Sequence, residues 1–234
     1  MTDEHDVIWT PDKVGRFWDS FSARRPGHYF SAMHAQALAR WIDRRARPGR
    51  HRLIDLGCGN GDLIAELARR GYSPLGIDSS PASLRVAARR VGDENVRLGS
   101  VTSIPVEDAS ATGILLIETI EHVLDEDLGP MMSEILRVLQ DGAPLVITTP
   151  NAEDIAAAQV TCPDCRARFH PMQHVRSWTA DGLRQFLEGH GFDRIETVTT
   201  RLPRGNGVPA LLRRAIYALR GDRPFLIAIA RPRR

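Results

Sequence analysis

Short apolar runs alternate with amphipathic segments through most of the chain, and this alternation limits the fold more than any other feature of the sequence. Each run has the length of a strand, and the segment after it often repeats apolar residues at helical spacing. The runs are RLIDLG (52–57), SPLGID (73–78), NVRLGS (95–100), TGILLIE (112–118), PLVITTP (144–150), FDRIETVTT (192–200) and PFLIAIARP (224–232). Short strands that alternate with helices predict an α/β fold, with a mostly parallel sheet and helices on both faces.

Capping residues mark where the intervening helices begin and end. Ser80 stands before Pro81, the pattern of a helix N-cap followed by proline at the first helical position. Thr179 is a second candidate N-cap, for a helix that ends before Gly191. We expect another helix over residues 127–142, terminated by its final glycine.

Two segments lie outside the alternation. Residues 1–50 are rich in aromatic side chains and are predicted to form an N-terminal helical cap. Residues 51–234 form the remaining domain, with inserts at 151–178 and 201–223, and we expect the whole chain to be a single compact domain. The cap and the second insert either act as lids over the strand ends or only cover the sheet; the sequence leaves both alternatives open.

Composition excludes several classes of protein. A net charge of +2 demands neither a nucleic-acid nor a membrane partner. No apolar run reaches the roughly 18 residues of a membrane span, and the acidic N-terminus lacks the apolar core of a secretion signal, so we expect a cytoplasmic protein. Three cysteines, an odd number, argue for reduced thiols. The oligomeric state is left open.

The first turn, LIDLGCGNGD, predicts a nucleotide site. Its glycines at 57, 59 and 61 let the main chain approach a ligand that a Cβ atom would exclude. Asp78 ends the next strand, where a carboxylate can accept hydrogen bonds from ribose hydroxyls. Asp55 puts negative charge beside the loop, which repels a pyrophosphate and attracts a cationic aminoacyl group. The close glycine spacing and this charge favour an adenosine cofactor with an aminoacyl group over NAD(P).

These motifs resemble those of the class I S-adenosylmethionine-dependent methyltransferases. LIDLGCGNGD, GID at 76–78, IETIEHV at 117–123 and the strand order carry the resemblance, which covers about residues 50–200. It implies a Rossmann-like fold with a seven-stranded, mostly parallel sheet, S-adenosyl-L-methionine as the cofactor and methyl transfer as the activity. A module that binds the cofactor without turnover is a weaker alternative.

The resemblance also implies which residues hold the cofactor. The glycine loop approaches its methionine part, and the end of the second strand holds its ribose. These residues are Asp55, Gly57, Cys58, Gly59, Asp78 and Ser79. The loop after the third strand flanks the adenine through Ser100 and Val101, and Ile117 completes the site. The family often has aspartate where this chain has Ser100, so the adenine contact is either weaker or comes from the main chain near Val101.

Ionisable residues gather after the fourth strand. Glu118, Glu121 and His122 lie on one turn, where ionised groups are costly unless something pairs with them. His174 follows the fifth strand, which the family strand order places next to the fourth. We hypothesise that these four residues bind one Mg²⁺ or Mn²⁺ ion, which holds two adjacent hydroxyls of the acceptor and acidifies one, with His122 and His174 as catalytic residues. The structural alternative has Glu118 near the methionine part, Glu121 exposed and His122 capping a turn.

A longer pattern relates these residues to two groups within the family. Glu-x-x-Glu-His, then TPN at 149–151 and His-x-x-x-Trp-Thr at 174–179, resembles metal-dependent small-RNA 3′-terminal 2′-O-methyltransferases. Glu-x-x-Glu-His also occurs in ubiquinone-pathway O-methyltransferases. We therefore predict O-methylation of a small hydroxylated molecule such as a sugar or a biosynthetic intermediate. The alternative is 2′-O-methylation of an RNA 3′-terminal ribose, which the arginines favour and the lack of a separate RNA-binding domain disfavours.

A cysteine pair suggests a second metal. TCPDCRARFHPMQH places Cys162, Cys165, His170 and His174 close to the spacing of a zinc knuckle. His174 cannot serve two metals, so a separate Zn²⁺ would use Cys162, Cys165 and His170 with a fourth ligand that the sequence does not identify. A loop with two free thiols and no metal is the other interpretation.

Overall fold

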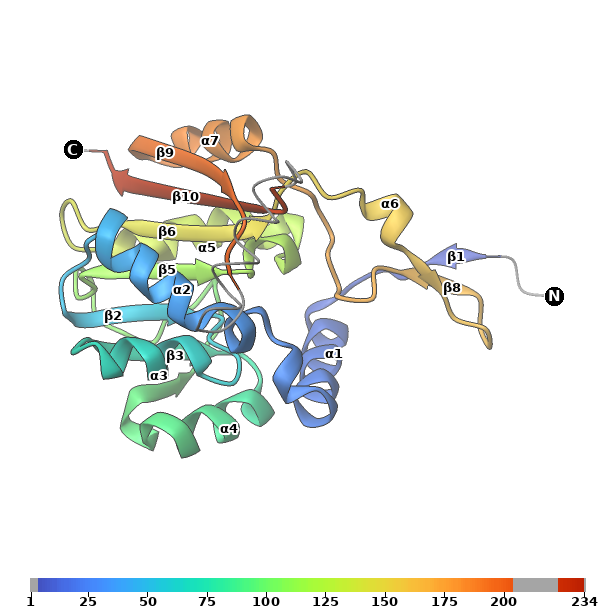
Figure 1. The fold of residues 1–234 in the computed structure, drawn as a ribbon. Coiled ribbons are helices and arrows are strands. Elements are labelled where there is room, and N and C mark those ends of the chain that lie inside the picture. The colour runs from blue at the N-terminus through green and yellow to red at the C-terminus, as the bar shows by residue number, and fades with distance from the viewer. Residues whose placement is uncertain (1–3, 204–222, 234) are drawn as a thin grey trace.

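The computed structural model describes residues 4–203 and 223–233, so the predicted insert at 201–223 lies almost wholly outside the described residues (Figure 1). The strands are β1 (His5–Asp6), β2 (His51–Leu56), β3 (Ser73–Asp78), β4 (Val96–Leu98), β5 (Gly113–Ile117), β6 (Leu145–Pro150), β7 (Val160–Thr161), β8 (Ala167–Phe169), β9 (Phe192–Thr200) and β10 (Phe225–Pro232). The α-helices are α1 (Pro11–Arg24), α2 (Phe30–Arg45), α3 (Asp62–Arg69), α4 (Pro81–Val91), α5 (Asp125–Val138), α6 (Ile155–Ala158) and α7 (Ala180–Gly189).

Seven of the described strands form one sheet in the order β4-β3-β2-β5-β6-β10-β9. The first five are parallel, whereas β10 is antiparallel to both β6 and β9. The chain order reverses between β2 and β5, and ligands of such sheets bind at the carboxyl ends of the strands at this point. The predicted Rossmann-like, mostly parallel sheet is confirmed.

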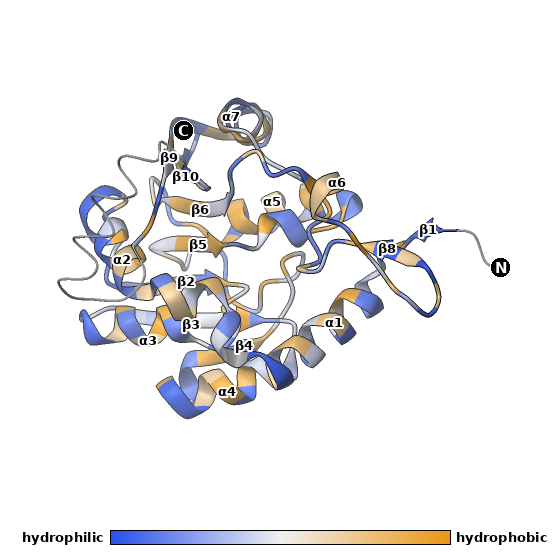
Figure 2. Cartoon of the chain, turned by 45° about the vertical axis from the view of Figure 1, so that its right-hand side comes forward, coloured by the Kyte–Doolittle hydropathy of each residue, from blue (hydrophilic) through white to orange (hydrophobic). Residues whose placement is uncertain are grey.

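Alternate residues of the central strands enter two separate cores. Ile114 and Leu116 of β5 join a core covered by α5 and α7, while Leu115 and Ile117 join a core covered by α2 and α3. Both faces of β5 are therefore buried, which explains why its sequence is uniformly apolar rather than alternating. The helices α3 and α4 instead mix hydrophilic and apolar residues, as helices with one buried face do (Figure 2).

The predicted helix caps form, and one predicted helix ends early. The Ser80 hydroxyl accepts a hydrogen bond from the Ser83 N–H, and the Thr179 hydroxyl accepts one from the Gly182 N–H, both at 3.1 Å. Each such cap typically contributes about 1 kcal/mol. The helix predicted for residues 127–142 spans Asp125–Val138 instead, because the main chain at 138–140 hydrogen-bonds to Ala111.

The two N-terminal helices have different positions. Leu38 and Ile42 of α2 are fully buried in the core beside α3, so this helix covers the sheet. The helix α1 packs instead against α4, near the carboxyl end of β3 (Figure 1). The short strand β1, which precedes α1, pairs in parallel with β8, and β7 completes a small sheet that projects away from the main one (Figure 1). The sequence did not predict this sheet.

None of the helices in the described part of the chain combines the length and the apolar character needed to cross a bilayer.

Candidate functional site

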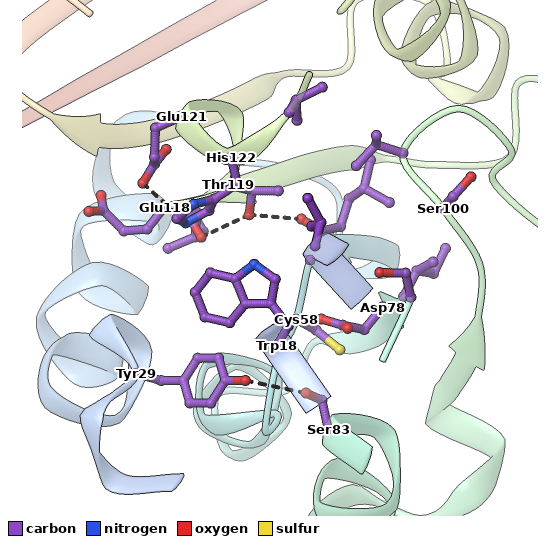
Figure 3. A pocket seen from close by; sticks show the side chains of 18 of the residues that line it. Trp18, Tyr29, Cys58, Asp78, Ser83, Ser100, Glu118, Thr119, Glu121 and His122 are labelled. Atoms are coloured by element: carbon purple, nitrogen blue, oxygen red, sulfur yellow. Dashed lines mark hydrogen bonds and ion pairs between the residues drawn. The ribbon is translucent and has the colours of Figure 1, made fainter. Parts of the chain in front are cut away.

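A cavity of about 610 Å³ lies at the reversal point of the sheet. The loops after β2, β3, β4 and β5 line it, and α1 lines its opposite side. Trp18 of α1 contacts Tyr29 on one side, with ring centroids 5.9 Å apart, and His122 on the other, at 4.8 Å (Figure 3). The cavity therefore connects the glycine loop with the Glu118–His122 turn.

The glycine loop adopts main-chain angles that other residues rarely take. Gly57 and Gly59 have φ values of +83° and +52°. A Cβ atom at Gly57 would lie 2.6 Å from the Thr119 hydroxyl oxygen, and one at Gly59 would lie 2.8 Å from the Tyr29 ring. Both positions therefore require glycine for conformation and for space, as the nucleotide motif predicts.

Main-chain donors hold the Asp78 carboxylate at the edge of the cavity. One oxygen accepts the Gly59 N–H and the other accepts the Ser80 N–H, both at 2.8 Å. Burial raises the pKa of Asp78, and these two hydrogen bonds oppose the rise. A carboxylate oxygen accepts more than one hydrogen bond, so Asp78 can also bind the hydroxyls of a ribose.

Asp19 of α1 reaches the same place. The Ser80 hydroxyl donates to the Asp19 carboxylate at 2.5 Å, and the Ser22 hydroxyl shares hydrogen bonds with Tyr29 and Ser83. These contacts hold α1 over the carboxyl end of β3. These contacts were not predictable from the sequence, because no local spacing relates α1 to residues some 60 positions away.

Asp55 has a buried carboxylate oxygen without a partner. The residue is 2% exposed, and its Oδ1 atom accepts no hydrogen bond. Burial, and then the charge of Asp78, raise the pKa of Asp55 to about 7. An unpaired carboxylate is costly in such a place, so the cavity is suited to a ligand with a positive group close to Asp55.

The other predicted cofactor residues also lie in the cavity wall. Ser79, Ser100, Val101 and Ile117 line it. Cys58 lines it too, and burial raises the pKa of its thiol well above the usual value, which makes the thiol a packing group rather than a nucleophile. The structure therefore brings all the predicted cofactor residues except Gly59 to the wall of one cavity, and Gly59 lies beside it, hydrogen-bonded to Asp78.

The two glutamates after β5 line the same cavity. Glu121 is 1% exposed, so the alternative in which it is a surface residue is wrong. Burial raises the pKa of Glu118 to about 7, and burial together with the Glu118 charge raises the pKa of Glu121 well above its usual value. Neither oxygen of Glu121 has a hydrogen-bond partner, although the Thr149 side chain is close. Glu118 also has a φ of +47°, a strained angle for a glutamate.

His122 presents one nitrogen to this carboxylate. Its Nδ1–H donates to the Gln173 carbonyl oxygen at 3.3 Å, because a carbonyl only accepts, and Nε2 lies 3.8 Å from Glu121 Oε1. Burial, followed by the charge of His174, lowers the pKa of His122 to about 3. His122 is therefore a neutral imidazole with its lone pair on Nε2, the form that binds metals.

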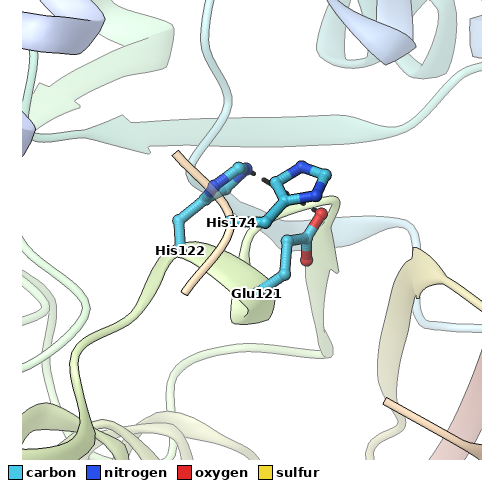
Figure 4. A group of neighbouring side chains, drawn as sticks. All are labelled: Glu121, His122 and His174. Atoms are coloured by element: carbon cyan, nitrogen blue, oxygen red, sulfur yellow. Dashed lines mark ion pairs between the residues drawn. The ribbon is translucent and has the colours of Figure 1, made fainter. Parts of the chain in front are cut away.

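Glu121, His122 and His174 bring ligand atoms within 4.8 Å of one another (Figure 4). Glu118 lines the same cavity but does not belong to this group, so the structure assembles three of the four predicted ligands. A second group joins His174 with Glu153 and His170. Glu153 was not among the predicted ligands, although its position just after β6 could have indicated it, since strand ends meet at this edge.

The cysteine pair lies elsewhere. Cys162 and Cys165 are in the turn between β7 and β8, and the pKa of Cys162 is lowered by the main-chain groups of Cys165 and Asp164. His170 is 5% exposed and lies with Glu153 and His174. In the described ranges, no group of three or more candidate ligands contains a cysteine, so the structure does not bring His170 together with the two thiols.

Comparison with known families gives a match to the model described as a methyltransferase domain, over residues 29–197. This range contains the glycine loop, Asp78 and the residues of both candidate ligand groups. The match covers more than half of the chain.

Named relatives and solved structures are similar to this chain. A probable S-adenosylmethionine-dependent methyltransferase of Mycolicibacterium smegmatis is 30% identical over 149 residues, which is 62% of this chain and 53% of the relative. A ubiquinone biosynthesis O-methyltransferase of Caulobacter sp. is 27% identical over 212 residues, 82% of each chain. The chain spans about half of the length of the first curated relatives that it matches.

The fold is shared with a putative methyltransferase of Haloferax volcanii, solved in complex with the Trm112 methyltransferase activator. The TM-score is 0.71 with 18% identity, and the match covers 94% of this chain and 98% of the other. At this identity the similarity shows the fold alone.

Proposed function

This chain belongs to the class I S-adenosylmethionine-dependent methyltransferases, as its motifs predict, and we propose that it methylates a hydroxyl oxygen of a small molecule with the help of a divalent cation. The observation that carries the proposal is the position of Glu121. Its carboxylate is buried without a hydrogen-bond partner, beside two histidines, in the cavity that the glycine loop also lines.

The residues present fit S-adenosylmethionine. The unpaired oxygen of Asp55 suits the ammonium group of its methionine part, the glycine loop lines the cavity that would hold that part, and Asp78 suits the ribose hydroxyls. When bound, the cofactor supplies an electrophilic methyl group on a sulfonium. The residues of this chain orient that methyl group and exclude water from it, with α1 held over the strand ends by the Asp19–Ser80 contact.

The residues present also fit a hard or borderline cation. Glu121, His122 and His174 offer oxygen and imidazole nitrogen ligands, and Glu118 is a further carboxylate in the same cavity. A dication would offset the charge of the two carboxylates, which burial otherwise disfavours. When bound there, Mg²⁺ or Mn²⁺ supplies Lewis acidity that makes a hydroxyl a better nucleophile.

The cavity wall favours an uncharged small acceptor over an RNA end. Among the described residues that line the cavity there is no lysine or arginine, whereas Asp55, Asp78, Glu118, Glu121 and Asp127 are all acidic. RNA binding relies on cationic side chains at the phosphates. Leu124 and Met172 add apolar surface to the same wall, which suits the body of a small hydroxylated compound. The O-methyltransferase name of the Caulobacter relative supports the same choice.

The test is methyl transfer from radiolabelled S-adenosylmethionine to two sets of acceptors: catechols and sugar diols, and short oligoribonucleotides with a free 3′ end. Each is assayed after dialysis against EDTA, with and without added Mg²⁺ or Mn²⁺. We expect methylation of a small acceptor that is lost in the chelator and restored by the cation. Activity on RNA alone would contradict the acceptor class, and full activity in EDTA would remove the cation from the mechanism.

Matched variants distinguish damage to the candidate site from damage to the folded structure. Glu121→Gln removes the ligand charge at nearly constant volume, and Glu188→Gln makes the same change at an exposed position of α7. We expect the first to lose cation-dependent activity while retaining S-adenosylhomocysteine binding, and the second to keep both. Equal activity of Glu121→Gln and the unchanged protein would contradict the role of Glu121.

A further inference from the structure

The ring of His170 is fixed by main-chain donors. Its Nδ1 atom accepts hydrogen bonds from the N–H of Met172 at 3.2 Å and from the N–H of His174 at 3.3 Å. A ring nitrogen that accepts hydrogen bonds carries no proton, so the proton of this neutral imidazole is on Nε2. The structure therefore assigns His170 the role of a donor through Nε2.

Glu153 lies between His170 and His174. Its Oε1 atom is 3.4 Å from His170 Nε2, and its Oε2 atom is 2.5 Å from His174 Nδ1. Two ligands of one ion, at bonds of about 2.1 Å and a right angle, would be about 3.0 Å apart. The shorter separation identifies the Glu153–His174 contact as a hydrogen bond, and since an ionised carboxylate only accepts, the proton is on His174 Nδ1.

We propose that Glu153, supported by His170, is a positioning residue that keeps the proton of His174 on Nδ1 and so leaves Nε2 as the nitrogen free to bind a cation. His174 then has the same pattern as His122, whose Nδ1–H is held by the Gln173 carbonyl oxygen. A carboxylate that orients a metal-binding histidine in this way commonly changes metal affinity by about 10–100-fold. Both histidines of the candidate site would thus be set before any ion arrives.

This inference rests on the proposed function only in so far as His174 is a ligand. It also gives His170 a role other than the predicted zinc ligand, because both nitrogens of its ring are engaged. Glu153 acts through His174, so its effect must appear in the state of that imidazole as well as in the affinity for metal.

The deciding experiment is long-range ¹H–¹⁵N NMR of the metal-free protein with ¹⁵N-labelled histidine, which reports the protonated nitrogen of each ring. The chain has 8 histidines, and His174→Gln identifies the signals of His174 by their loss. We expect His174 to be protonated on Nδ1, and we expect Glu153→Gln to shift it toward the Nε2 tautomer, because one amide oxygen cannot serve both donors. An Nε2-protonated His174 in the unchanged protein overturns the proposal.

Mn²⁺ binding, followed by electron paramagnetic resonance, is the second measurement. We expect Glu153→Gln to raise the Mn²⁺ dissociation constant by about 10–100-fold, and Glu188→Gln to leave it unchanged. An unchanged dissociation constant in Glu153→Gln contradicts the positioning role. Failure of the unchanged protein to bind Mn²⁺ would remove the cation from the proposed function, while the tautomer of His174 would still be measured by NMR.

Discussion

Gln173 and His122 are joined by two hydrogen bonds that run in opposite directions. The His122 ring donates to the main-chain oxygen of Gln173 at 3.3 Å, and the side-chain amide of Gln173 donates to the main-chain oxygen of His122 at 3.1 Å. The same amide accepts the indole N–H of Trp18 at 3.0 Å. Gln173 is fully buried. Helix α1, the turn that carries Glu121 and the loop that carries His174 therefore meet at one side chain that solvent does not reach.

Gln173→Leu should destabilise the protein and loosen the site together. The change leaves the His122 carbonyl and the Trp18 indole, both partly buried, without their partners, which costs about 1–3 kcal/mol for each group. We expect a loss of about 2–4 kcal/mol in the free energy of unfolding, measured in urea, and a lower rate of methyl transfer at saturating cofactor. Gln185→Leu, at an exposed position of α7, is the matched control and should change neither quantity.

Asp55→Asn should alter how stability depends on pH. The folded state holds the Asp55 proton more tightly than the unfolded state, because burial and the charge of Asp78 raise the pKa from 3.8 to about 7. Between these values the native protein binds more protons, so its free energy of unfolding falls as the pH rises through about 7. From pH 5 to pH 8 the ionisation of this single group should lower the free energy of unfolding by about 2–3 kcal/mol. Asp55→Asn has no such group and should not show this decrease.

The measurement is urea unfolding of the cofactor-free protein and the variant at pH 5 and pH 8. Only the difference between the two proteins reports Asp55, since their other groups are the same. Asp141→Asn, at an exposed position, serves as the control for removal of a charge. Parallel curves for the unchanged protein and Asp55→Asn would show that Asp55 is ionised at low pH and that its carboxylate already has a partner.

Gly59→Ala should weaken cofactor binding through the main chain. Alanine at a φ of +52° is strained, and its Cβ would meet the Tyr29 ring at 2.8 Å. We expect the variant to be about 1–3 kcal/mol less stable and to bind S-adenosylhomocysteine more weakly by calorimetry. Gly189→Ala, where a Cβ meets nothing within 4 Å, should be neutral or slightly stabilising. If Gly59→Ala bound the cofactor as tightly as the unchanged protein, the glycine loop would not be part of the cofactor site.

The strand ends were predictable from the sequence. A strand that is buried on both faces of a sheet is apolar along its whole length, so the end of the apolar run marks the end of the strand. The parallel arrangement then places Asp55, Asp78 and Glu118 at one edge without knowledge of any side-chain contact. The remaining parts of the site depend on tertiary contacts that no periodicity encodes. Trp18 meets Gln173 across 155 positions, and the pairing of β1 with β8 joins segments equally distant. Such contacts follow from packing once the sheet exists.

Arg137→Lys should weaken the adenine side of the cofactor site. The Arg137 guanidinium donates to the main-chain oxygens of Ile104 and Val106, at 2.9 and 3.0 Å, and so holds the loop that carries Ser100 and Val101. A lysine cannot reproduce this fork. We expect the dissociation constant of S-adenosylhomocysteine to rise about tenfold, equivalent to about 1.4 kcal/mol.

A variant within the same loop is the control for Arg137→Lys. Glu107 forms an ion pair with Arg52 at 3.3 Å, and both side chains are largely exposed. Exposed pairs contribute little, so Glu107→Gln should leave the dissociation constant within a factor of about two. A similar loss in both variants would mean that the loop responds to any change of charge rather than to the Arg137 contacts.

The three thiols should react in a fixed order, and that order bears on the zinc hypothesis. The main-chain groups of Cys165 and Asp164 lower the pKa of Cys162, whereas burial raises that of Cys58 well above its usual value. Because the thiolate is the nucleophile, iodoacetamide at pH 7 should label Cys162 first and Cys58 only on unfolding, as read by mass spectrometry of tryptic peptides. One equivalent of Zn²⁺ should slow the labelling of Cys162 and Cys165 if both bind the metal, and His170→Gln should leave that protection unchanged, because His170 lies with Glu153 and His174 rather than with the thiols. Rapid labelling in the presence of Zn²⁺ would leave the turn between β7 and β8 as a pair of free thiols.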